Sequence, residues 1–124
     1  MAVQMKEPGP AHAISVHPEG SRVRVSFNGR VIAETTRAKR LQEGSLPPVL
    51  YIPRDDADMT ALRRTAHHTH CPFKGDASYY SIEADGERAE NAVWTYEDPY
   101  PPAVPVTNFL AFYPDKVRIV TEPA

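Results

Sequence analysis

The stretch VRVSFNGRVIA, residues 23–33, decides the fold class of this chain. Its residues Val23, Val25 and Phe27 alternate with polar neighbours, which is the period of two expected of a half-buried strand. Asn28-Gly29 follows directly, and this dipeptide readily adopts the two positive φ angles of a tight hairpin turn. A valine, an isoleucine and an alanine then supply the returning strand. The stretch therefore predicts an antiparallel hairpin.

Similar signals recur on both sides of this hairpin. Residues 77–84 are rich in aromatic and β-branched types, Asp85-Gly86 is a second hairpin signal, and residues 92–96 return as a strand. Further strands are expected at residues 14–16, 49–52, 109–113 and 117–120, the last two on either side of a Pro-Asp turn.

Helical signals are fewer. Residues 35–43 contain helix formers and end at Gly44, which predicts a short helix. Asp55 or Asp56 is a suitable cap for a second helix that continues through Arg64. The 13 prolines of the chain remove backbone donors and fix φ, so both helices and strands should be short.

These elements predict a mostly β fold. About seven or eight short strands with one or two short helices would form a curved antiparallel sheet or a small open barrel. The 124 residues suffice for one domain, which we place at residues 11–124. Residues 1–10, with two prolines around a glycine, are expected to form a flexible N-terminal arm.

The composition limits the partners and the compartment. A formal net charge of -2 with interspersed signs offers no broad positive field, so nucleic acid is not expected as a partner. The basic residues Arg37, Lys39 and Arg40 are interpreted as a solvated face. No apolar run approaches the roughly 18 residues that span a bilayer, and no signal peptide is recognised, so neither membrane association nor export is expected. The single cysteine, Cys71, agrees with a reducing cytoplasm.

The segment THCPFKG, residues 69–75, concentrates chemically active side chains. Positive charge from Lys74 or His70 would favour the thiolate of Cys71, which predicts either an activated cysteine or an anion-binding loop. The alternative is a buried, inert thiol in a turn shaped by Pro72. His67 and His68 stand nearby, but adjacent residues of an extended chain point to opposite faces, so no metal site and no cofactor are expected.

Two further groups combine aromatic and acidic residues. Tyr51 ends a predicted strand shortly before Asp55 and Asp56, whose carboxylates suit helix capping as well as ligand binding. Trp94 and Tyr96 are two residues apart and so face the same side of their strand. That aromatic face belongs either to the core or to the wall of a pocket.

Taken in order, these motifs form a longer pattern. It comprises Tyr51-Ile52-Pro53-Arg54-Asp55-Asp56, Thr69-x-Cys71-Pro72-x-Lys74-Gly75-x-Ala77-x-Tyr79, Trp94-x-Tyr96 with Pro99, and Ala111-Phe112-Tyr113. The pattern resembles the bacterial family catalogued as domain of unknown function 427, from about Val23 to Val120. The resemblance implies a compact, mostly β fold and brings no established activity. A nucleotidyltransferase label used for that family is not adopted, because the chain lacks a Gly-Ser helix start followed by a paired-aspartate strand.

The function is therefore unknown from sequence, and three hypotheses remain. The first is a small-molecule binding module whose ligand contacts Tyr51, Asp55, Asp56, Cys71, Lys74, Tyr79, Trp94 and Tyr96. The second is an enzyme with Cys71 as nucleophile or redox centre and Lys74 beside it. The third is a protein-interaction scaffold that uses the proline-rich residues 99–105 and a sheet edge.

Overall fold

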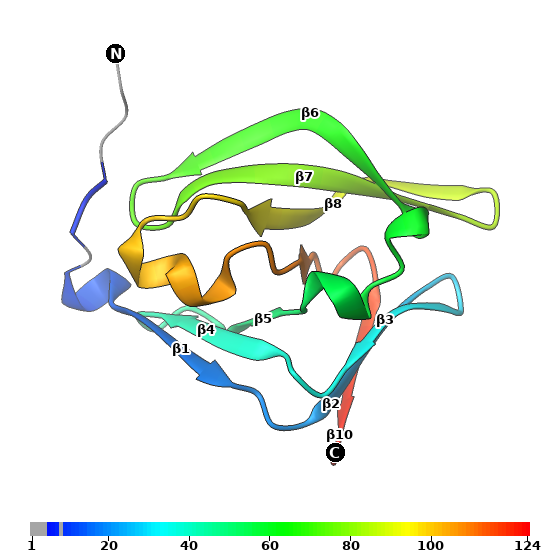
Figure 1. Cartoon of the computed structure of the whole chain (residues 1–124), viewed down its shortest axis with the longest axis horizontal. Coiled ribbons are helices and arrows are strands. Elements are labelled where there is room, and N and C mark those ends of the chain that lie inside the picture. Colours follow the sequence, from blue (N-terminus) through cyan, green and yellow to red (C-terminus); the bar gives the residue numbers. More distant parts are fainter. Residues whose placement is uncertain (1–4, 8) are drawn as a thin grey trace.

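The computed structural model describes residues 5–7 and 9–124. In this part of the chain, ten strands form three antiparallel sheets (Figure 1). The strands are β1 (Ile14–Pro18), β2 (Arg22–Phe27), β3 (Arg30–Thr35), β4 (Lys39–Glu43), β5 (Val49–Tyr51), β6 (Leu62–Cys71), β7 (Gly75–Ala84), β8 (Glu87–Tyr96), β9 (Ala111–Phe112) and β10 (Arg118–Glu122). Four short 3-10 helices connect them: η1 (Pro10–His12), η2 (Arg54–Asp56), η3 (Met59–Ala61) and η4 (Pro101–Val106).

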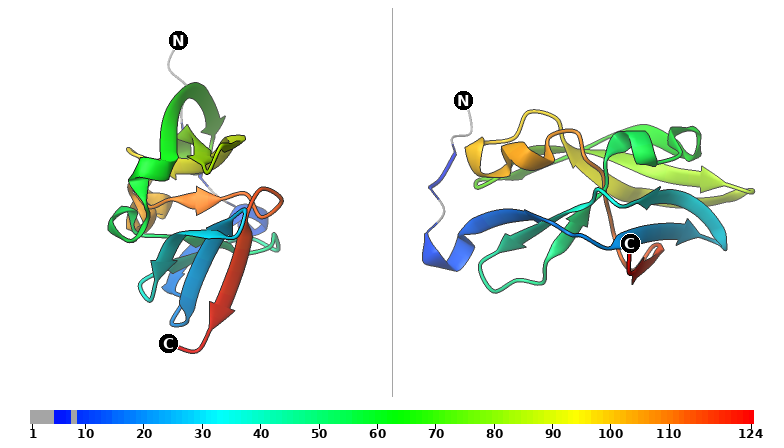
Figure 2. Two further views of the ribbon diagram at one scale, coloured as in Figure 1. Left: turned by 90° about the vertical axis from the view of Figure 1, so that its right-hand side faces the viewer. Right: turned by 60° about the horizontal axis from the view of Figure 1, so that its bottom comes forward.

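The sheets have the strand orders β1-β4-β5, β10-β2-β3 and β6-β7-β8-β9. Figure 1 shows the four-stranded sheet above and the two three-stranded sheets below, with η4 between the layers on one side. The views of Figure 2 show β10, in red, running beside β2. The expected mostly β class is confirmed. The strand count exceeds the predicted seven or eight because segments predicted as helix are strands.

Both predicted hairpins are confirmed. Asn28 and Gly29 have φ angles of 52° and 81°, and β2 pairs with β3 across them. Asp85 and Gly86 have φ angles of 54° and 80° and join β7 to β8. Positive φ at both central residues matches the right-handed twist of the flanking strands, which is why these dipeptides end strands so reliably.

The buried side chains form two clusters. One lies between β2, β3, β7 and β8 and is centred on fully buried aliphatic residues such as Val23, Ile32 and Ile82. The other lies between the sheet β1-β4-β5 and the opposite end of β7 and β8. It contains Leu41, Tyr51, Ala77, Tyr79, Tyr96, Ala103, Val106 and Ala111. Three tyrosines in one cluster bring several hydroxyl groups into the interior, and the candidate site is built around them.

The prediction of a helix at residues 35–43 is wrong. Strand β4 lies there between β1 and β5, and Leu41 and Glu43 face inward with a period of two. An isolated helix of about two turns is marginal in water. As the central strand of a sheet, the same residues exchange hydrogen bonds on both sides.

The prediction of a long helix from Asp55 or Asp56 through Arg64 is also wrong. Only the single turns η2 and η3 form, and β6 begins at Leu62. Neither aspartate caps a helix; Asp58 instead accepts a hydrogen bond from the backbone of Thr60 at 3.1 Å. Seven of the ten residues of β6 pair with β7, so the gain from strand pairing outweighs local helical preference.

The last two strands exist but do not pair with each other as a hairpin. β9 pairs with β8, whereas β10 crosses to the edge of β2.

Residues 1–4 and 8 of the predicted flexible arm lie outside the described residues. Lys6 of this arm donates its backbone N–H to the carbonyl of Pro72 at 2.7 Å. In the described part of the chain, no helix has the length and apolar character needed to cross a membrane.

Candidate functional site

A cavity of about 260 Å³ lies between the sheet β1-β4-β5 and the strands β7 and β8. Its walls combine aliphatic, aromatic and charged side chains from elements distant in sequence. They are Leu41, Glu43, Leu46, Pro47, Val49, Tyr51, Lys74, Tyr79, Trp94, Tyr96 and Tyr113. Five of the eight residues predicted to bind a ligand therefore line one cavity.

The aromatic wall follows from the register of β7 and β8. Tyr79 is paired directly with Trp94, and Ala77 is paired with Tyr96, so these side chains share one face of the sheet. The small side chain opposite Tyr96 leaves space on that face. The prediction that Trp94 and Tyr96 face the same side is thus confirmed.

Short contacts tie the aromatic side chains together. Trp94 donates its indole N–H to the hydroxyl of Tyr51 at 3.3 Å, and the two rings meet nearly at right angles. The hydroxyl of Tyr79 lies 2.9 Å from that of Thr69 and 3.4 Å from that of Tyr113. The ring of Tyr113 lies 4.6 Å from that of Trp94. These contacts fix the rings before any ligand arrives.

The turn between β6 and β7 brings Lys74 to the cavity. The N–H of Lys74 bonds to the carbonyl of Cys71 at 3.3 Å, and the carbonyl of Lys74 accepts from Tyr100 at 2.9 Å. Gly75 has a φ of 110°, and a Cβ there would lie 3.4 Å from the backbone of Pro99. The backbone angle favours glycine at this position, whereas a contact of 3.4 Å would be an ordinary van der Waals contact.

Glu43 faces Lys74 across the cavity wall, and sequence analysis missed it. Its carboxylate forms an ion pair with the Lys74 ammonium, and its second oxygen lies 3.1 Å from Nδ1 of His12. The Glu43 and Lys74 side chains are only 11% and 15% exposed. Burial opposes ionisation of Glu43, but hydrogen bonds from Lys74 and His12 outweigh it and lower its pKa. The sequence offered no signal, because Glu43 ended a segment predicted as a short helix.

The phenols of Tyr51 and Tyr96 remain protonated. Burial raises the pKa of both, and the nearby groups of Cys71 and Glu43 raise it further. The pKa of Tyr113 is raised to about 12, mainly by burial and then by its hydrogen bond with Tyr79. The cavity therefore presents hydroxyl groups as neutral hydrogen-bond donors.

The other predicted site residues do not line the cavity. Cys71 is half-buried at the end of β6 and does not line the cavity. Asp56 accepts hydrogen bonds from Thr35 at 2.7 Å and Arg37 at 3.0 Å, away from the cavity. Asp55 borders a separate hollow beside Arg54. The structure thus separates both aspartates from the aromatic cluster.

The histidines of β6 make individual contacts. The His67 ring lies 4.5 Å from that of Tyr79, and Nδ1 of His70 lies 2.6 Å from the carboxylate of Asp76. Among residues 5–7 and 9–124, no group of three or more His, Cys, Asp or Glu side chains is arranged to hold a metal ion.

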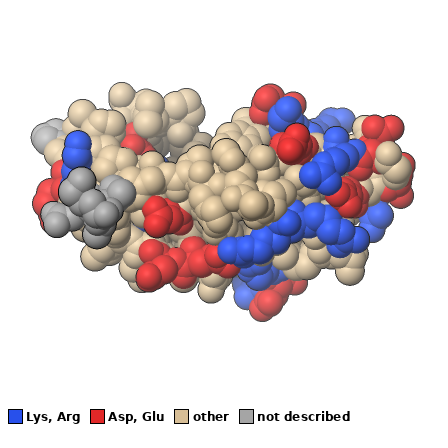
Figure 3. Space-filling model, turned by 90° about the horizontal axis from the view of Figure 1, so that it is seen from above, with Lys and Arg blue, Asp and Glu red and all other residues tan. Residues whose placement is uncertain are grey.

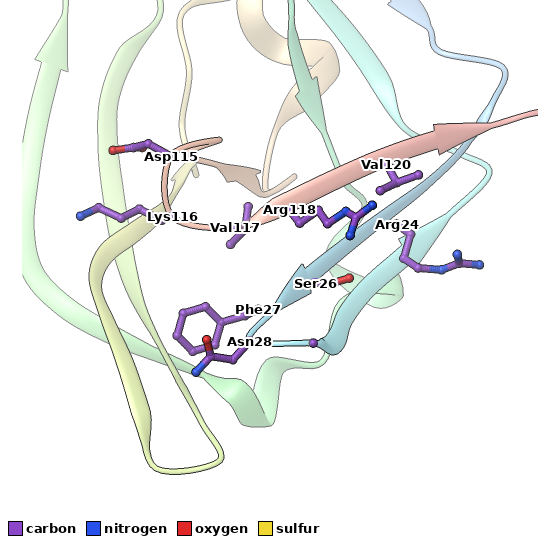
Figure 4. A pocket seen from close by; sticks show the side chains of 10 residues that line it. Arg24, Ser26, Phe27, Asn28, Asp115, Lys116, Val117, Arg118 and Val120 are labelled. Carbon is purple, nitrogen blue, oxygen red and sulfur yellow. The ribbon is translucent and has the colours of Figure 1, made fainter.

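A wider hollow of about 600 Å³ lies on the outer side of β2 and β10 (Figure 4). Phe27 and Asn28 lie at one end and Arg24 and Arg118 toward the other. Arg24 already forms ion pairs with Glu34 at 2.9 Å and with Glu122 at 3.3 Å. The lining of this open hollow includes one aromatic side chain, against five in the aromatic cavity, so it is a weaker candidate.

Charged residues also neutralise one another on the face seen in Figure 3, where basic and acidic side chains lie close together toward one end. Arg64 binds Glu97 at 2.6 Å, and Arg63 lies 3.5 Å from Glu83. The hydrogen bond from Arg64 is the main reason that the pKa of Glu97 falls to about 2.

A comparison with protein-family models found a match to the domain of unknown function DUF427 over residues 15–123. The chain belongs to this family. The DUF427 match includes every residue that lines the aromatic cavity, and it confirms the resemblance noted from the motifs. A comparison with curated proteins found no match. Membership of the DUF427 family carries no activity, so a function has to be proposed from the site itself.

Proposed function

We propose that this protein is a small-molecule binding module whose ligand occupies the cavity between β4, β5, β7 and β8. The observation that carries the proposal is the set of five aromatic side chains around one cavity with a buried ion pair in its wall. Ligand sites are typically apolar concavities with a few fixed polar groups, and this cavity has that composition.

The arrangement supports binding more than cysteine catalysis. Lys74, the cation expected to activate Cys71, directs its ammonium to Glu43 instead. An ion pair of this kind leaves little positive charge to favour a thiolate. The enzyme hypothesis therefore remains a prediction with less support, and alkylation rates of Cys71 in the native and unfolded chain would test it.

The scaffold hypothesis also has less support. Residues 101–106 form η4, in which Ala103 and Val106 are fully buried. Proline-rich segments that recruit partners are generally exposed and extended, so that a groove can enclose them. Here the segment contributes to the core beside the cavity.

The test uses the indole N–H of Trp94, because the chain has one tryptophan and it lines the cavity. We would record NMR spectra of the 15N-labelled protein with a library of single-ring compounds at about 1 mM, a concentration that detects weak binding. Compounds that enter the cavity should shift the indole resonance. Absence of any shift across the library would refute the proposal.

Two matched variants separate binding in the cavity from binding elsewhere. Leu46→Phe narrows the cavity at a half-exposed lining residue, whereas Val104→Phe makes a similar change on η4, outside the lining. Ligand-induced shifts should persist in Val104→Phe and weaken in Leu46→Phe. Equal weakening in both variants would mean that the compounds bind at another surface.

A further inference from the structure

The charges in the cavity wall are already balanced. Glu43 places one carboxylate oxygen on Lys74 and the other 3.1 Å from His12, so both oxygens are engaged. Because Glu43 already neutralises Lys74, neither an anionic nor a cationic ligand would meet an uncompensated opposite charge in the cavity wall. A charged ligand would therefore lose its hydration for little gain in charge pairing.

In contrast to the charges, two hydrogen-bond donors in the cavity have no acceptor among the described residues. The hydroxyl of Tyr96 has no hydrogen bond with any described residue, although the residue is only 5% exposed. Every fully buried side-chain nitrogen or oxygen in the described residues has a partner, so this hydroxyl must contact the open space of the cavity. Tyr51 accepts from Trp94, and no described residue accepts the proton of Tyr51. Two phenol protons are thus free to be donated.

The shape of the cavity favours a flat occupant. Trp94 is tilted against Tyr113 at 4.6 Å and is paired across the strands with Tyr79. Rings bind other rings in stacked or edge-on geometry, and these side chains offer both. The volume of about 260 Å³ equals that of about nine water molecules at about 30 Å³ each, which suits a single substituted ring.

We propose that the ligand of this cavity is a neutral, planar ring compound with a carbonyl oxygen that accepts hydrogen bonds from Tyr51 and Tyr96. This inference rests on the proposed function and narrows it to one ligand class. Lys74 then serves to neutralise Glu43 and to fix the wall, rather than to bind an anion. The ring of the ligand stacks with Trp94 and Tyr113, and its carbonyl oxygen points to the phenols of Tyr51 and Tyr96.

The test compares three probes of one shape: benzamide, benzoate and benzylamine. Binding is measured at pH 7.5 by calorimetry and by the indole resonance of Trp94. We expect benzamide to bind at least tenfold more tightly than either charged analogue. Tighter binding of benzoate or benzylamine would overturn the inference while leaving the proposed function standing, because the cavity would still be the binding site.

Two phenylalanine variants test the donors. Tyr96→Phe and Tyr51→Phe each remove one hydroxyl and should weaken benzamide binding about fivefold, the usual effect of one neutral hydrogen bond. Tyr80→Phe is the matched control, since its hydroxyl binds Arg54 and lies outside the cavity lining. Unchanged affinity in both cavity variants would overturn the carbonyl assignment. If benzamide fails to bind while other library compounds shift the indole resonance of Trp94, only the inference about the ligand class fails. If no compound shifts this resonance, the proposed function fails as well.

Discussion

Replacement of Lys74 by methionine should reveal how strongly the buried ion pair holds the site together. Removing one member of a buried pair typically costs about 3–5 kcal/mol. The side chains of Lys74 and Glu43 keep 15% and 11% exposure, and His12 still contacts Glu43 in the variant. We therefore expect the free energy of unfolding to fall by about 2 kcal/mol at pH 7.5, measured by urea denaturation.

The pH dependence of this loss identifies its cause. In the wild type the pKa of Glu43 lies below its ordinary value of 4.5. The ion pair therefore contributes its full stabilisation above about pH 4.5, and this contribution is lost as pH falls through the pKa of Glu43 in the folded protein. In Lys74→Met the hydrogen bond and charge of Lys74 no longer lower the pKa of Glu43, so this pKa is higher than in the wild type. The deficit in stability relative to wild type should therefore shrink as pH falls from about 7.5 to about 4.

The double variant Glu43→Gln/Lys74→Met completes the experiment. Without either charge, the wall contains no unpaired ion, so its stability should lie within about 1 kcal/mol of wild type. Additive losses from the two single changes, or a deficit of Lys74→Met that does not vary with pH, would refute the electrostatic reasoning.

Three further changes test other parts of the structure. Arg64→Met should raise the pKa of Glu97 from about 2 toward its ordinary value of 4.5 in an NMR titration, with little change in stability because both side chains are exposed to solvent. Thr95→Val should lower the free energy of unfolding in urea by about 1–2 kcal/mol, because its fully buried hydroxyl donates to a backbone carbonyl that would lose its partner. Gly44→Ala should lower the melting temperature, since φ is 53° and the added Cβ would overlap the carbonyl oxygen of Ala11; an unchanged melting temperature would contradict that packing.

Much of the site was within reach of sequence reasoning because it depends on local geometry. Asn28-Gly29 and Asp85-Gly86 form tight turns through their own backbone preferences. The alternation of side chains along a strand placed Trp94 and Tyr96 on one face. These conclusions require only interactions between residues close in the chain.

The errors share a different origin. Residues 39–43 and 62–71 carry mixed local preferences, and pairing with other strands decided their conformation: β4 pairs with the more distant β1, and β6 pairs with β7, which follows it in the chain. β10 pairs with β2, from which it is separated by most of the chain, and no local sequence pattern predicts this pairing. For β4 and β6, the hydrogen bonds and burial gained from the partner strands exceed the small propensity of a short segment for helix.

The sequence by itself determined the mostly β class, the two hairpins and the shared face of the aromatic residues. The tertiary structure alone decided that Glu43 meets Lys74 and that Asp55 and Asp56 lie apart from the cavity. It also decided that the phenol of Tyr96 has no hydrogen-bond partner among residues 5–7 and 9–124. Turns and strand alternation are set by neighbouring residues, whereas charge pairing and cavity walls depend on which strands pack together.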